Sequence, residues 1–511
     1  MLLKRIVICL LSLLICIEGN PSVVLTEKEL KLIRFISYLT YLQDSSTWNG
    51  WETNYNGTQL DLDAIRYPLA HIGYTAAALA HRTPNYRELA VNLLKNTIQR
   101  LIKIDVWKYV DFYWSKSASF PDPVVHENIM YSGHLLQVLT LYESISGDLS
   151  FDSDGFDFIW NETVRFHYTT TKLADAIYQQ IADESSGGVC CEPGWVYTIC
   201  QNHPHLGLKL YDVVRNHQTN YSQISLKWKE YLLKHALEDI PLYKQNRYFK
   251  MLYQRETHVW VPFFASTGND GWALAWLSPW FDQNQTSQFV CDGWKIMFDN
   301  KFWKTPTNDT CFLDSGGYIG VRMQLNSWVA TSFYPIVEKQ CSIEATQRLN
   351  CTFNWFDQQF GREIDTDNDS YAESFYYETK NFYSNWVTTN LLLSFLIGQN
   401  KDFLRNIYNS NFHEQFASQP EVLLVDYPFV RVTRAFYQID QRLLTINLST
   451  QKPMILSTHF QVKFPSEILR LGNITRQGQT QRFTFDKLAQ NLIQIQFDFD
   501  EQQTEFNISF F

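Results

Sequence analysis

The chain has few charged residues and no long hydrophobic run beyond its first residues. Only 19% of its 511 residues are charged, and acidic residues outnumber basic ones to give a formal net charge of −10. This balance argues against nucleic acid or an anionic membrane as the main partner, because both attract basic surfaces. No later segment approaches the apolar length of a membrane helix, so we expect no stable membrane anchor. Aromatic residues are abundant at 16%, which excludes a disordered chain and suits either a well-packed core or an apolar or carbohydrate-like ligand.

Cysteine is scarce, and its spacing does not match a zinc site. Two of the nine cysteines lie in the N-terminal run, and seven remain: Cys190, Cys191, Cys200, Cys291, Cys311, Cys341 and Cys351. In an oxidising compartment, proximity alone favours pairing Cys291 with Cys311 and Cys341 with Cys351, although connectivity cannot be deduced from sequence. The odd number means that at least one thiol is free or pairs outside the chain.

The N-terminus has the pattern of a secretory signal peptide. Lys4 and Arg5 precede an almost unbroken apolar run from Ile6 to Ile17, too short to span a bilayer. We therefore predict a signal peptide over residues 1–20, the alternative being a buried N-terminal helix. Ten N-x-S/T sequons agree with a secreted or lumenal protein, at Asn56, Asn161, Asn220, Asn284, Asn308, Asn350, Asn368, Asn447, Asn473 and Asn507.

The hydrophobic pattern divides the remaining chain into a helical part over 21–414 and a β-rich part over 415–511. Helical periodicity recurs in segments of 10 to 18 residues from about residue 26 to 410, separated by Asn-, Asp-, Ser- and Gly-rich loops. Antiparallel helix pairs of this kind close into a barrel or stack into a solenoid, and the absence of a fixed-period repeat favours the barrel. The C-terminal segments are short, β-branched and aromatic, which predicts a small antiparallel β-domain arranged as a sandwich.

The segment GGVCCEPGWVYTICQNHPH carries the strongest chemical signal. Pro193 suits the first position of a helix, which would place Cys191 and Glu192 at its positive end, where the pKa of a thiol falls. Cys200 lies nine residues after Cys191, so the two share a pocket only if Cys191 belongs to the loop before the helix. The alternative interpretation is a disulfide or two buried thiols, and a disulfide would remove the thiol chemistry.

Two further segments hold candidate polar groups. Met130 and His134 are one helical turn apart, so His134 is a candidate acid or base and Met130 an apolar wall, although a buried structural histidine is the alternative. Gly133 between them would let that helix approach a neighbour closely. Asp61 and Tyr67 are candidates for binding a substrate hydroxyl, while capping of the following helix is the alternative role for Asp61 and for Asp63.

Together these stretches resemble the linalool dehydratase-isomerase domain family. The resemblance rests on D-x5-Y (Asp61 and Tyr67), on N-I-M-x-S-G-H ending at His134, and on C-E-P-x6-C-x-N from Cys191 to Asn202. It covers roughly residues 26–410 and does not extend to the β-rich tail. It implies a mainly α fold with an (α/α)6 barrel, here followed by the small antiparallel β domain, and an apolar small-molecule substrate without metal or organic cofactor.

The resemblance also implies a catalytic group, namely Cys191, Cys200, His134, Asp61 and Tyr67. We expect the two cysteines to be acid and base for loss of water from an allylic, terpenoid-like alcohol, with His134 and Asp61 setting their protonation; covalent attachment through a cysteine is an open variant. Candidates for contacting the substrate are Met130, Glu192, Asp270 and Trp272. A tyrosine that the family places ahead of W-x-L-A is missing here, where Gly268, Asn269 and Asp270 stand, so the substrate is in doubt.

Two alternative functions remain open. A secreted carbohydrate-active enzyme on the same type of barrel would need two carboxylates, for which Asp61, Glu192 and Asp270 are candidates. A non-catalytic carrier of lipids or terpenoids would retain a ligand without turnover. The sequence leaves open whether the chain forms a homo-oligomer.

Overall fold

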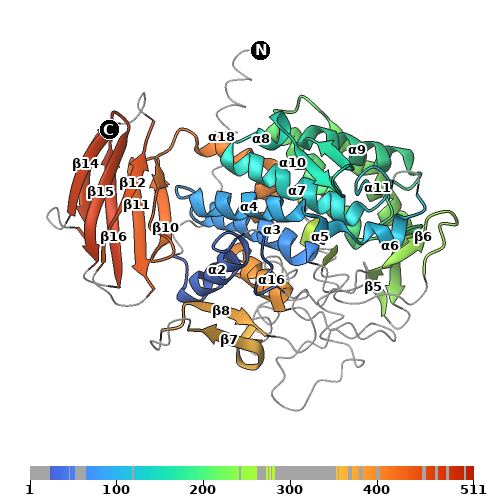
Figure 1. Cartoon of the computed structure of the whole chain (residues 1–511). Coiled ribbons are helices and arrows are strands. Elements are labelled where there is room, and N and C mark those ends of the chain that lie inside the picture. Colours follow the sequence, from blue (N-terminus) through green and yellow to red (C-terminus); the bar gives the residue numbers. More distant parts are fainter. Residues whose placement is uncertain are drawn as a thin grey trace.

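The computed structural model describes residues 24–51, 65–261, 272–281, 353–365, 371–378, 384–398, 403–451, 456–465, 470–478, 483–499 and 502–511, with short gaps at 45, 118–119, 241–242, 274, 278 and 355. The predicted signal peptide and the cysteines at 291, 311, 341 and 351 lie outside these residues. Within them, the chain is helix-rich and ends in antiparallel sheets, which confirms the predicted order of a helical part and a β-rich part. Figure 1 shows the helices together and the sheets at the opposite end of the molecule.

The helical part is built from eleven α-helices among the described residues, several of them single turns. They are α2 (Glu27–Thr40), α3 (Arg66–Arg82), α4 (Glu88–Leu101), α5 (Ile104–Trp107), α6 (Val110–Trp114), α7 (Ile129–Ser146), α8 (Ser150–Ser153), α9 (Thr170–Asp183), α10 (Asn202–Val214), α11 (Ser225–Tyr231) and α16 (Ser384–Ile397). Two short helices, α17 (Phe403–Asn409) and α18 (Phe412–Phe416), lead to the sheets. The predicted helical periodicity is confirmed at α3, α4, α7, α9, α10, α11 and α16. None of the described helices combines the length and hydropathy needed to cross a membrane.

The centre of the helical part is formed by α3, α7, α10 and α16. Helix α7 packs against α3, α4, α9 and α10, and α3 packs against α4, α7 and α16. Nearly every residue of α7 and α3 is buried, including polar ones, as expected for helices enclosed on all sides. Side chains that these four helices direct toward one another are therefore shielded from water.

Short hairpins interrupt the helices, and the sequence pattern did not indicate them. They pair β1 (Phe156–Ile159) with β2 (Arg165–Tyr168), β3 (Trp195–Tyr197) with β6 (Leu252–Gln254), β4 (Leu237–Ile240) with β5 (Tyr243–Phe249), and β7 (Gly361–Ile364) with β8 (Ser374–Tyr377). Each of these strands has three to seven residues, too few for a period of two to stand out in the sequence.

The C-terminal strands form two four-stranded antiparallel sheets that face each other (Figure 1). One sheet has the order β10 (Val430–Gln438), β11 (Leu443–Thr450), β16 (Gln503–Phe510), β13 (Leu471–Arg476). The other has the order β14 (Phe483–Ala489), β15 (Leu492–Phe499), β12 (Leu456–Lys463), β9 (Glu421–Leu423). Phe506 contacts Phe460 and Phe497 across the interface, with ring centroids 5.2 and 4.9 Å apart. Buried and exposed residues alternate along β15, which is the pattern of a strand with one face in a sandwich core.

The β-sandwich is joined to the helices by hydrogen bonds that centre on Asn85. This residue lies in the loop between α3 and α4 and is 1% exposed. Its side chain accepts from the backbone N–H of Tyr437 (2.8 Å) and donates to the carbonyl oxygen of Pro420 (2.7 Å). Nearby, Arg431 donates through both terminal nitrogens to the Glu27 carboxylate at 2.9 and 3.0 Å. The sandwich is thus held against the helical part by the buried hydrogen bonds of Asn85 and by the ion pair of buried Arg431 with exposed Glu27.

We predict that Asn85→Ala lowers the free energy of unfolding by about 3 kcal/mol. The substitution leaves the Tyr437 N–H and the Pro420 carbonyl without their partner, and each such buried group costs about 1–3 kcal/mol. Urea titration followed by tryptophan fluorescence measures the loss. Asn96→Ala is the control, because Asn96 also donates one side-chain hydrogen bond but lies half-buried on α4; its cost should be about 0.5 kcal/mol. Equal losses in the two variants would contradict the role given to Asn85.

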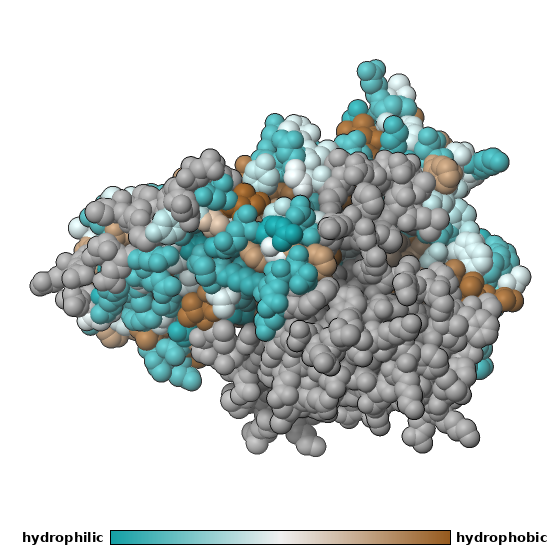
Figure 2. All heavy atoms as spheres, turned by 90° about the horizontal axis from the view of Figure 1, so that it is seen from below, coloured by the Kyte–Doolittle hydropathy of each residue, from teal (hydrophilic) through white to brown (hydrophobic). Residues whose placement is uncertain are grey.

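Figure 2 shows the molecule from below. On this face the described residues are mainly hydrophilic, and the hydrophobic residues occur in small separate groups. Isolated exposed apolar residues of this kind are ordinary for a protein surface.

Candidate functional site

The cysteine-bearing segment folds as a loop between α9 and α10. Cys191 precedes β3, Cys200 lies in a 3-10 turn (Ile199–Gln201), and α10 follows directly. Pro193 is exposed in the turn that closes between Glu192 and Trp195, so the prediction that it begins a helix is wrong. The reason is local: Gly194 adopts a positive φ of 78°, which makes a tight turn there and sends the chain into β3. Cys191 thus belongs to the loop, which is the condition under which the two cysteines can meet.

Cys191 and Cys200 form a disulfide in this structure, and both residues are 2% exposed. Their Cα atoms lie 6.7 Å apart. Cys190, the neighbouring cysteine, is free and buried, and burial raises the pKa of its thiol. In the disulfide state neither Cys191 nor Cys200 carries a proton, so acid–base chemistry by these two sulfur atoms requires the reduced dithiol.

Hydrogen bonds fix this loop against the start of α7. The side chain of Gln201 accepts from the N–H of Val189 (2.9 Å) and donates to its carbonyl (2.8 Å). The N–H of Ile129, the first residue of α7, donates to the carbonyl oxygen of Cys190 at 3.1 Å. The cysteines are therefore held in register with the helix that carries His134.

Glu192 is the carboxylate beside the disulfide. It is partly buried and accepts a hydrogen bond from the Tyr197 hydroxyl at 2.9 Å. Burial raises the pKa of Glu192, opposed by that hydrogen bond and by the positive charge of Arg66. A carboxyl group with a raised pKa is a candidate proton donor as well as an acceptor.

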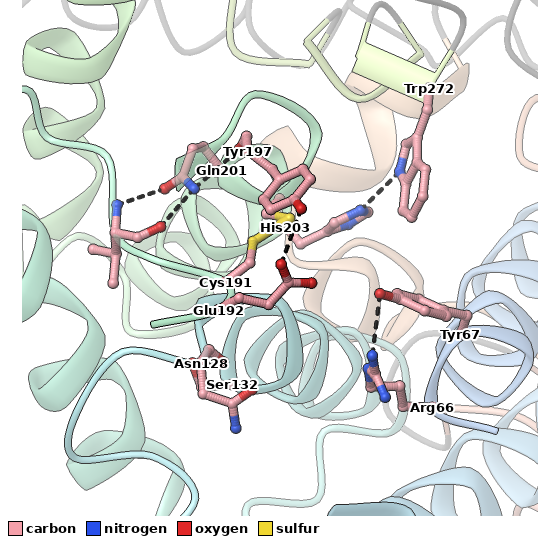
Figure 3. Close-up of a disulfide and its surroundings, with 12 residues drawn as sticks. Arg66, Tyr67, Asn128, Ser132, Cys191, Glu192, Tyr197, Gln201, His203 and Trp272 are labelled. Atoms are coloured by element: carbon pink, nitrogen blue, oxygen red, sulfur yellow. Dashed lines mark hydrogen bonds between the residues drawn. A yellow bond between two sulfur atoms is a disulfide. The ribbon is translucent and has the colours of Figure 1, made fainter. Parts of the chain in front are cut away.

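Tyr67 occupies the centre of an aromatic cluster drawn from several helices. Its ring stacks on Trp386 of α16 with centroids 4.7 Å apart, and Trp272 meets it edge-on at 6.0 Å. Its hydroxyl accepts from Arg66 at 3.3 Å, and the Arg66 guanidinium lies between the rings of Tyr67 and Tyr109 at 4.5 and 4.4 Å. Figure 3 shows the Tyr67 hydroxyl and the Glu192 carboxylate pointing toward the region beside the disulfide.

His134 lies next to a second buried histidine, His203 of α10. Their ring centroids are 3.8 Å apart, and His134 also meets Tyr67 edge-on at 6.0 Å. Nδ1 of His134 pairs with the hydroxyl of Tyr74 at 2.5 Å, and Trp272 donates its indole N–H to Nε2 of His203 at 3.0 Å. Both histidines are 0% exposed. Side chains from α3, α7, α10 and α16 therefore meet in one buried cluster.

Burial keeps these imidazoles neutral. It lowers the pKa of His134 well below its ordinary value, and neighbouring His203, His71 and Arg66 lower it further. Burial also lowers the pKa of His203, and that of His71 to about 4. His134 is therefore a neutral imidazole, with a hydrogen-bond donor on one ring nitrogen and an acceptor on the other. Its predicted role as acid or base depends on which nitrogen carries the proton.

The close approach of His134 and His203 depends on Gly133. A Cβ atom at Gly133 would lie 2.6 Å from Cδ and 2.9 Å from the backbone nitrogen of Pro204, directly after His203. The prediction that Gly133 lets its helix approach a neighbour is confirmed, and the neighbour is α10.

We therefore predict that Gly133→Ala lowers the free energy of unfolding by about 2 kcal/mol, since the two backbones must separate. Alanine is the better helix former by about 1 kcal/mol, so a loss would show that packing outweighs propensity. Thermal and urea unfolding measure the change. Ser132→Ala is the control on the same buried helix, because it removes an atom where Gly133→Ala adds one. A stabilised Gly133→Ala protein would contradict this packing.

The outcome for the predicted residues is mixed. Tyr67, His134 and Trp272 meet in the aromatic cluster, Glu192 lies beside the disulfide, and Met130 is 2% exposed within α7. Asp61 and Asp270 lie outside the described residues. Asp63 also lies outside them, and helix α3 begins at Arg66 with Ile65 at its N-cap position. Among the residues described, no group of three or more His, Cys, Asp and Glu side chains is placed to hold a metal ion.

Sequence reasoning missed His203, Tyr74, Arg66 and Trp386. His203 directly follows the C-x-N element that ends at Asn202, so the signal was adjacent to a recognised motif. Tyr74 is one turn beyond His71 and two beyond Tyr67 on α3, and this spacing repeats one helix face.

The solved structures that are similar to this chain have low TM-scores and low sequence identity to it. An alpha-1,6-mannanase from Salegentibacter sp. HEL1_6 is 11% identical, with a TM-score of 0.42, covering 74% of this chain and 99% of that one. A protein from Listeria innocua is 11% identical with a TM-score of 0.43, covering 73% and 96%. The endoglucanase CelQ from Clostridium thermocellum is 11% identical with a TM-score of 0.35, covering 94% and 92%. Scores of this size carry no conclusion about fold or function here.

A family model gives the decisive comparison. The model described as "Linalool dehydratase/isomerase" matches residues 66–318, a range that contains the Tyr67, His134 and Cys191–Cys200 segments. It begins one residue before Tyr67 and spans α3 to α11. Through these residues the chain belongs to the linalool dehydratase/isomerase family.

Proposed function

We propose that this protein is a cofactor-free hydro-lyase and isomerase that acts on an allylic, terpenoid-like alcohol. Family membership supports this reaction class. The observation that carries the proposal is the contact of Tyr67, His134 and Trp272, from three separate segments, in a buried aromatic cluster beside Cys191, Cys200 and Glu192. An apolar surrounding with few oriented polar groups suits a substrate that is mostly hydrocarbon with one hydroxyl.

The reaction needs an acid and a base close together. Protonation of the hydroxyl lets the C–O bond break, so that water leaves and an allylic cation remains. A base then removes a proton from the neighbouring carbon to give the diene, or water returns to the far end of the allyl system to give the isomeric alcohol. The acid loses one proton and the base gains one, and exchange between them restores the site. Aromatic walls such as Tyr67, Trp272 and Trp386 shelter the cation from bulk water.

In this proposal the reduced Cys191 and Cys200 are the acid and base, since a thiol pKa of about 8.5 allows proton exchange near neutrality. The disulfide is then the inactive state, and a dithiol reductant converts it to the active one. Tyr67 and His134 bind the substrate oxygen, Asp61 influences the protonation of the thiols, and Met130, Glu192, Asp270 and Trp272 contact the substrate. We further propose that the helices close into an (α/α)6 barrel around this site, which the packing of α3 against α7 and α16, and of α7 against α10, supports.

A panel of substrates tests the proposed function. The purified protein, reduced with dithiothreitol, is incubated with tertiary and primary allylic alcohols and, in parallel, with oligosaccharides, and products are identified by mass spectrometry. A diene or an isomeric alcohol supports the proposal. Release of sugars instead would overturn it in favour of a carbohydrate-active enzyme using paired carboxylates. Retention of an intact alcohol without product would overturn it in favour of a carrier.

We also propose that the protein enters the secretory pathway. The N-terminal apolar run, the sequons and the disulfide support this location. Among the described sequons, Asn161, Asn220 and Asn473 have exposed side chains. Asn447 is half-buried on the inner strand β11 and donates to Glu505 at 3.0 Å.

We therefore predict glycans on the exposed sequons and none on Asn447. Asn161→Gln should increase the electrophoretic mobility of protein expressed in a eukaryotic secretory host by the equivalent of one glycan, because its side chain projects from the β1–β2 hairpin. Asn447→Gln is the matched control and should leave the mobility unchanged. Glycosidase treatment that removes the difference between variants confirms its origin. Unglycosylated protein from that host would contradict the proposed location.

A further inference from the structure

The hydrogen bonds around His203 fix which of its nitrogens carries the proton. The indole N–H of Trp272 only donates, so Nε2 of His203, 3.0 Å away, must accept. The neutral ring then carries its proton on Nδ1, which lies 2.8 Å from Oε1 of Gln137. The side-chain amide of Gln137 in turn donates to the hydroxyl of Tyr408. This assignment does not depend on which way the Gln137 amide was oriented, because a donor facing Nδ1 would leave His203 with no proton at all.

The same reasoning fixes the direction in which the hydroxyl of Tyr74 donates its hydrogen bond. Its hydroxyl lies 3.3 Å from Nδ1 of His203 and 2.5 Å from Nδ1 of His134. Because Nδ1 of His203 already carries a proton, it cannot accept from Tyr74. Burial raises the pKa of Tyr74 well above its ordinary value, so the phenol keeps its proton. That proton is satisfied when the hydroxyl donates to Nδ1 of His134, and His134 must then hold its own proton on Nε2.

Nε2 of His134 is the last atom of this series of hydrogen bonds, on a ring that lies against Tyr67 and Trp272 of the aromatic cluster. The atom is buried and has no hydrogen-bond partner among the described residues. A buried N–H without an acceptor is costly, so natural proteins keep such a group where a ligand or water completes it. The ring of Tyr67, which the family motif also marks, faces His134 edge-on at 6.0 Å.

We propose that His134 is a hydrogen-bond donor to the oxygen of the substrate hydroxyl, and that His203 and Trp272 are positioning residues that hold it in the Nε2–H form through Tyr74. The inference rests on the proposed function, because it assigns the oxygen to an alcohol substrate. It adds two residues, His203 and Tyr74, that no motif named. His134 in this form cannot remove a proton with Nε2, so it stabilises the departing oxygen and leaves the base role to another group.

The protonation state is measured first, without any substrate. Protein labelled with 15N at histidine is studied by long-range 1H–15N correlation, which distinguishes Nδ1–H from Nε2–H rings, and His134→Gln and His203→Gln spectra assign the two signals. We expect Nε2–H for His134 and Nδ1–H for His203. A proton on Nδ1 of His134, or an imidazolium at neutral pH, would overturn the proposal whether or not the protein turns over an alcohol.

Trp272→Phe then tests whether the hydrogen bond from Trp272 to His203 determines which nitrogen of His134 carries the proton. Loss of the indole N–H frees Nε2 of His203, so both histidine signals should become mixtures of the two forms, and kcat on an allylic alcohol should fall about tenfold. His134→Gln, which alters the donor itself, should cost about 100-fold in kcat. Trp276→Phe is the matched control, because the Trp276 ring contacts His203 at 5.5 Å while the hydrogen bond comes from Trp272. It should leave both histidine signals unchanged.

The two readouts separate the inference from the proposed function. The expected histidine forms in a protein that converts no allylic alcohol would support the hydrogen-bond assignment and overturn the proposed reaction. Turnover that is unaffected by Trp272→Phe, with histidine signals shifted as expected, would overturn the role of the Nε2–H form in the reaction.

Discussion

Cys191→Ser in the reduced protein is expected to lower turnover of an allylic alcohol by about 1,000-fold, and Cys200→Ser by a similar factor. A serine hydroxyl holds its proton far too tightly to exchange it near neutral pH, and loss of one positioned acid or base costs about 10²–10⁴-fold. The same reasoning predicts that the wild-type protein gains activity on titration with dithiothreitol, since the structure pairs these two cysteines. Initial rates measured by gas chromatography, with thiols counted in parallel, relate activity to the dithiol form.

Cys190→Ala is the matched control, because this thiol is adjacent in sequence, buried, and outside the disulfide. It should retain most of the activity and the same response to reductant. Reduction also removes a cross-link that closes a short loop, so circular dichroism must show that each reduced protein remains folded. Equal rates for the oxidised and reduced wild type would rule out acid–base chemistry by the two sulfur atoms, and Glu192 with its raised pKa would be the next acid to test.

Much of the fold followed from the sequence because its elements differ in period. Helices such as α4 and α9 are long enough and have one polar face, so they show a 3.6-residue pattern, and β15 and β16 alternate with a period of two. The hairpins within the helical part have strands too short to carry either signal. The sequence pattern does not indicate how the sandwich joins the helices, whereas in the structure Asn85 and Glu27 tie the two parts together by contacts between residues more than 330 positions apart. Contacts at such separations leave no local pattern in the sequence.

The candidate site was predictable where family motifs mark it and unpredictable where packing creates it. The motifs supplied Tyr67, His134, Cys191 and Cys200. They did not supply His203, which becomes significant only because Gly133 and Pro204 let α7 and α10 meet closely. Pro193 misled the prediction because its usual place at a helix start competes with its use in turns, and the glycine that follows decides for the turn.

Acidification from pH 6.5 to 5.5 is expected to lower the free energy of unfolding by about 4 kcal/mol. Four histidines, at positions 71, 134, 203 and 205, are at most 3% exposed. Burial holds the pKa of His71 at about 4 and that of His205 at about 3, and those of His134 and His203 lie well below the ordinary value. The unfolded chain, with histidine pKa values of about 6.5, therefore holds about two more protons on these rings than the folded protein at pH 6.5 and nearly four more at pH 5.5. Over this window each ring contributes about 1 kcal/mol.

The sign follows from where the protons bind. Stability from a depressed histidine pKa is fully present above about pH 6.5 and is lost as pH falls toward the folded-state value. Glu143 and Glu192 act in the opposite direction, because burial raises their pKa and the folded state binds their protons first. Urea titrations at several pH values measure the net slope, which these two carboxyl groups make somewhat shallower.

Single substitutions separate the histidine contribution from the rest. His205→Gln should reduce the loss by about 1 kcal/mol, since it removes one buried titrating ring while an amide can still meet the hydroxyl of Ser225, 2.9 Å from Nδ1. His167→Gln is the control, because the His167 side chain is 60% exposed, unlike the buried ring of His205. A stability that stays level down to pH 5.5 would mean that the folded protein already holds these rings protonated. A protonated His203 could not accept from Trp272, so that result would also remove the hydrogen-bond chain on which the Nε2–H form of His134 depends.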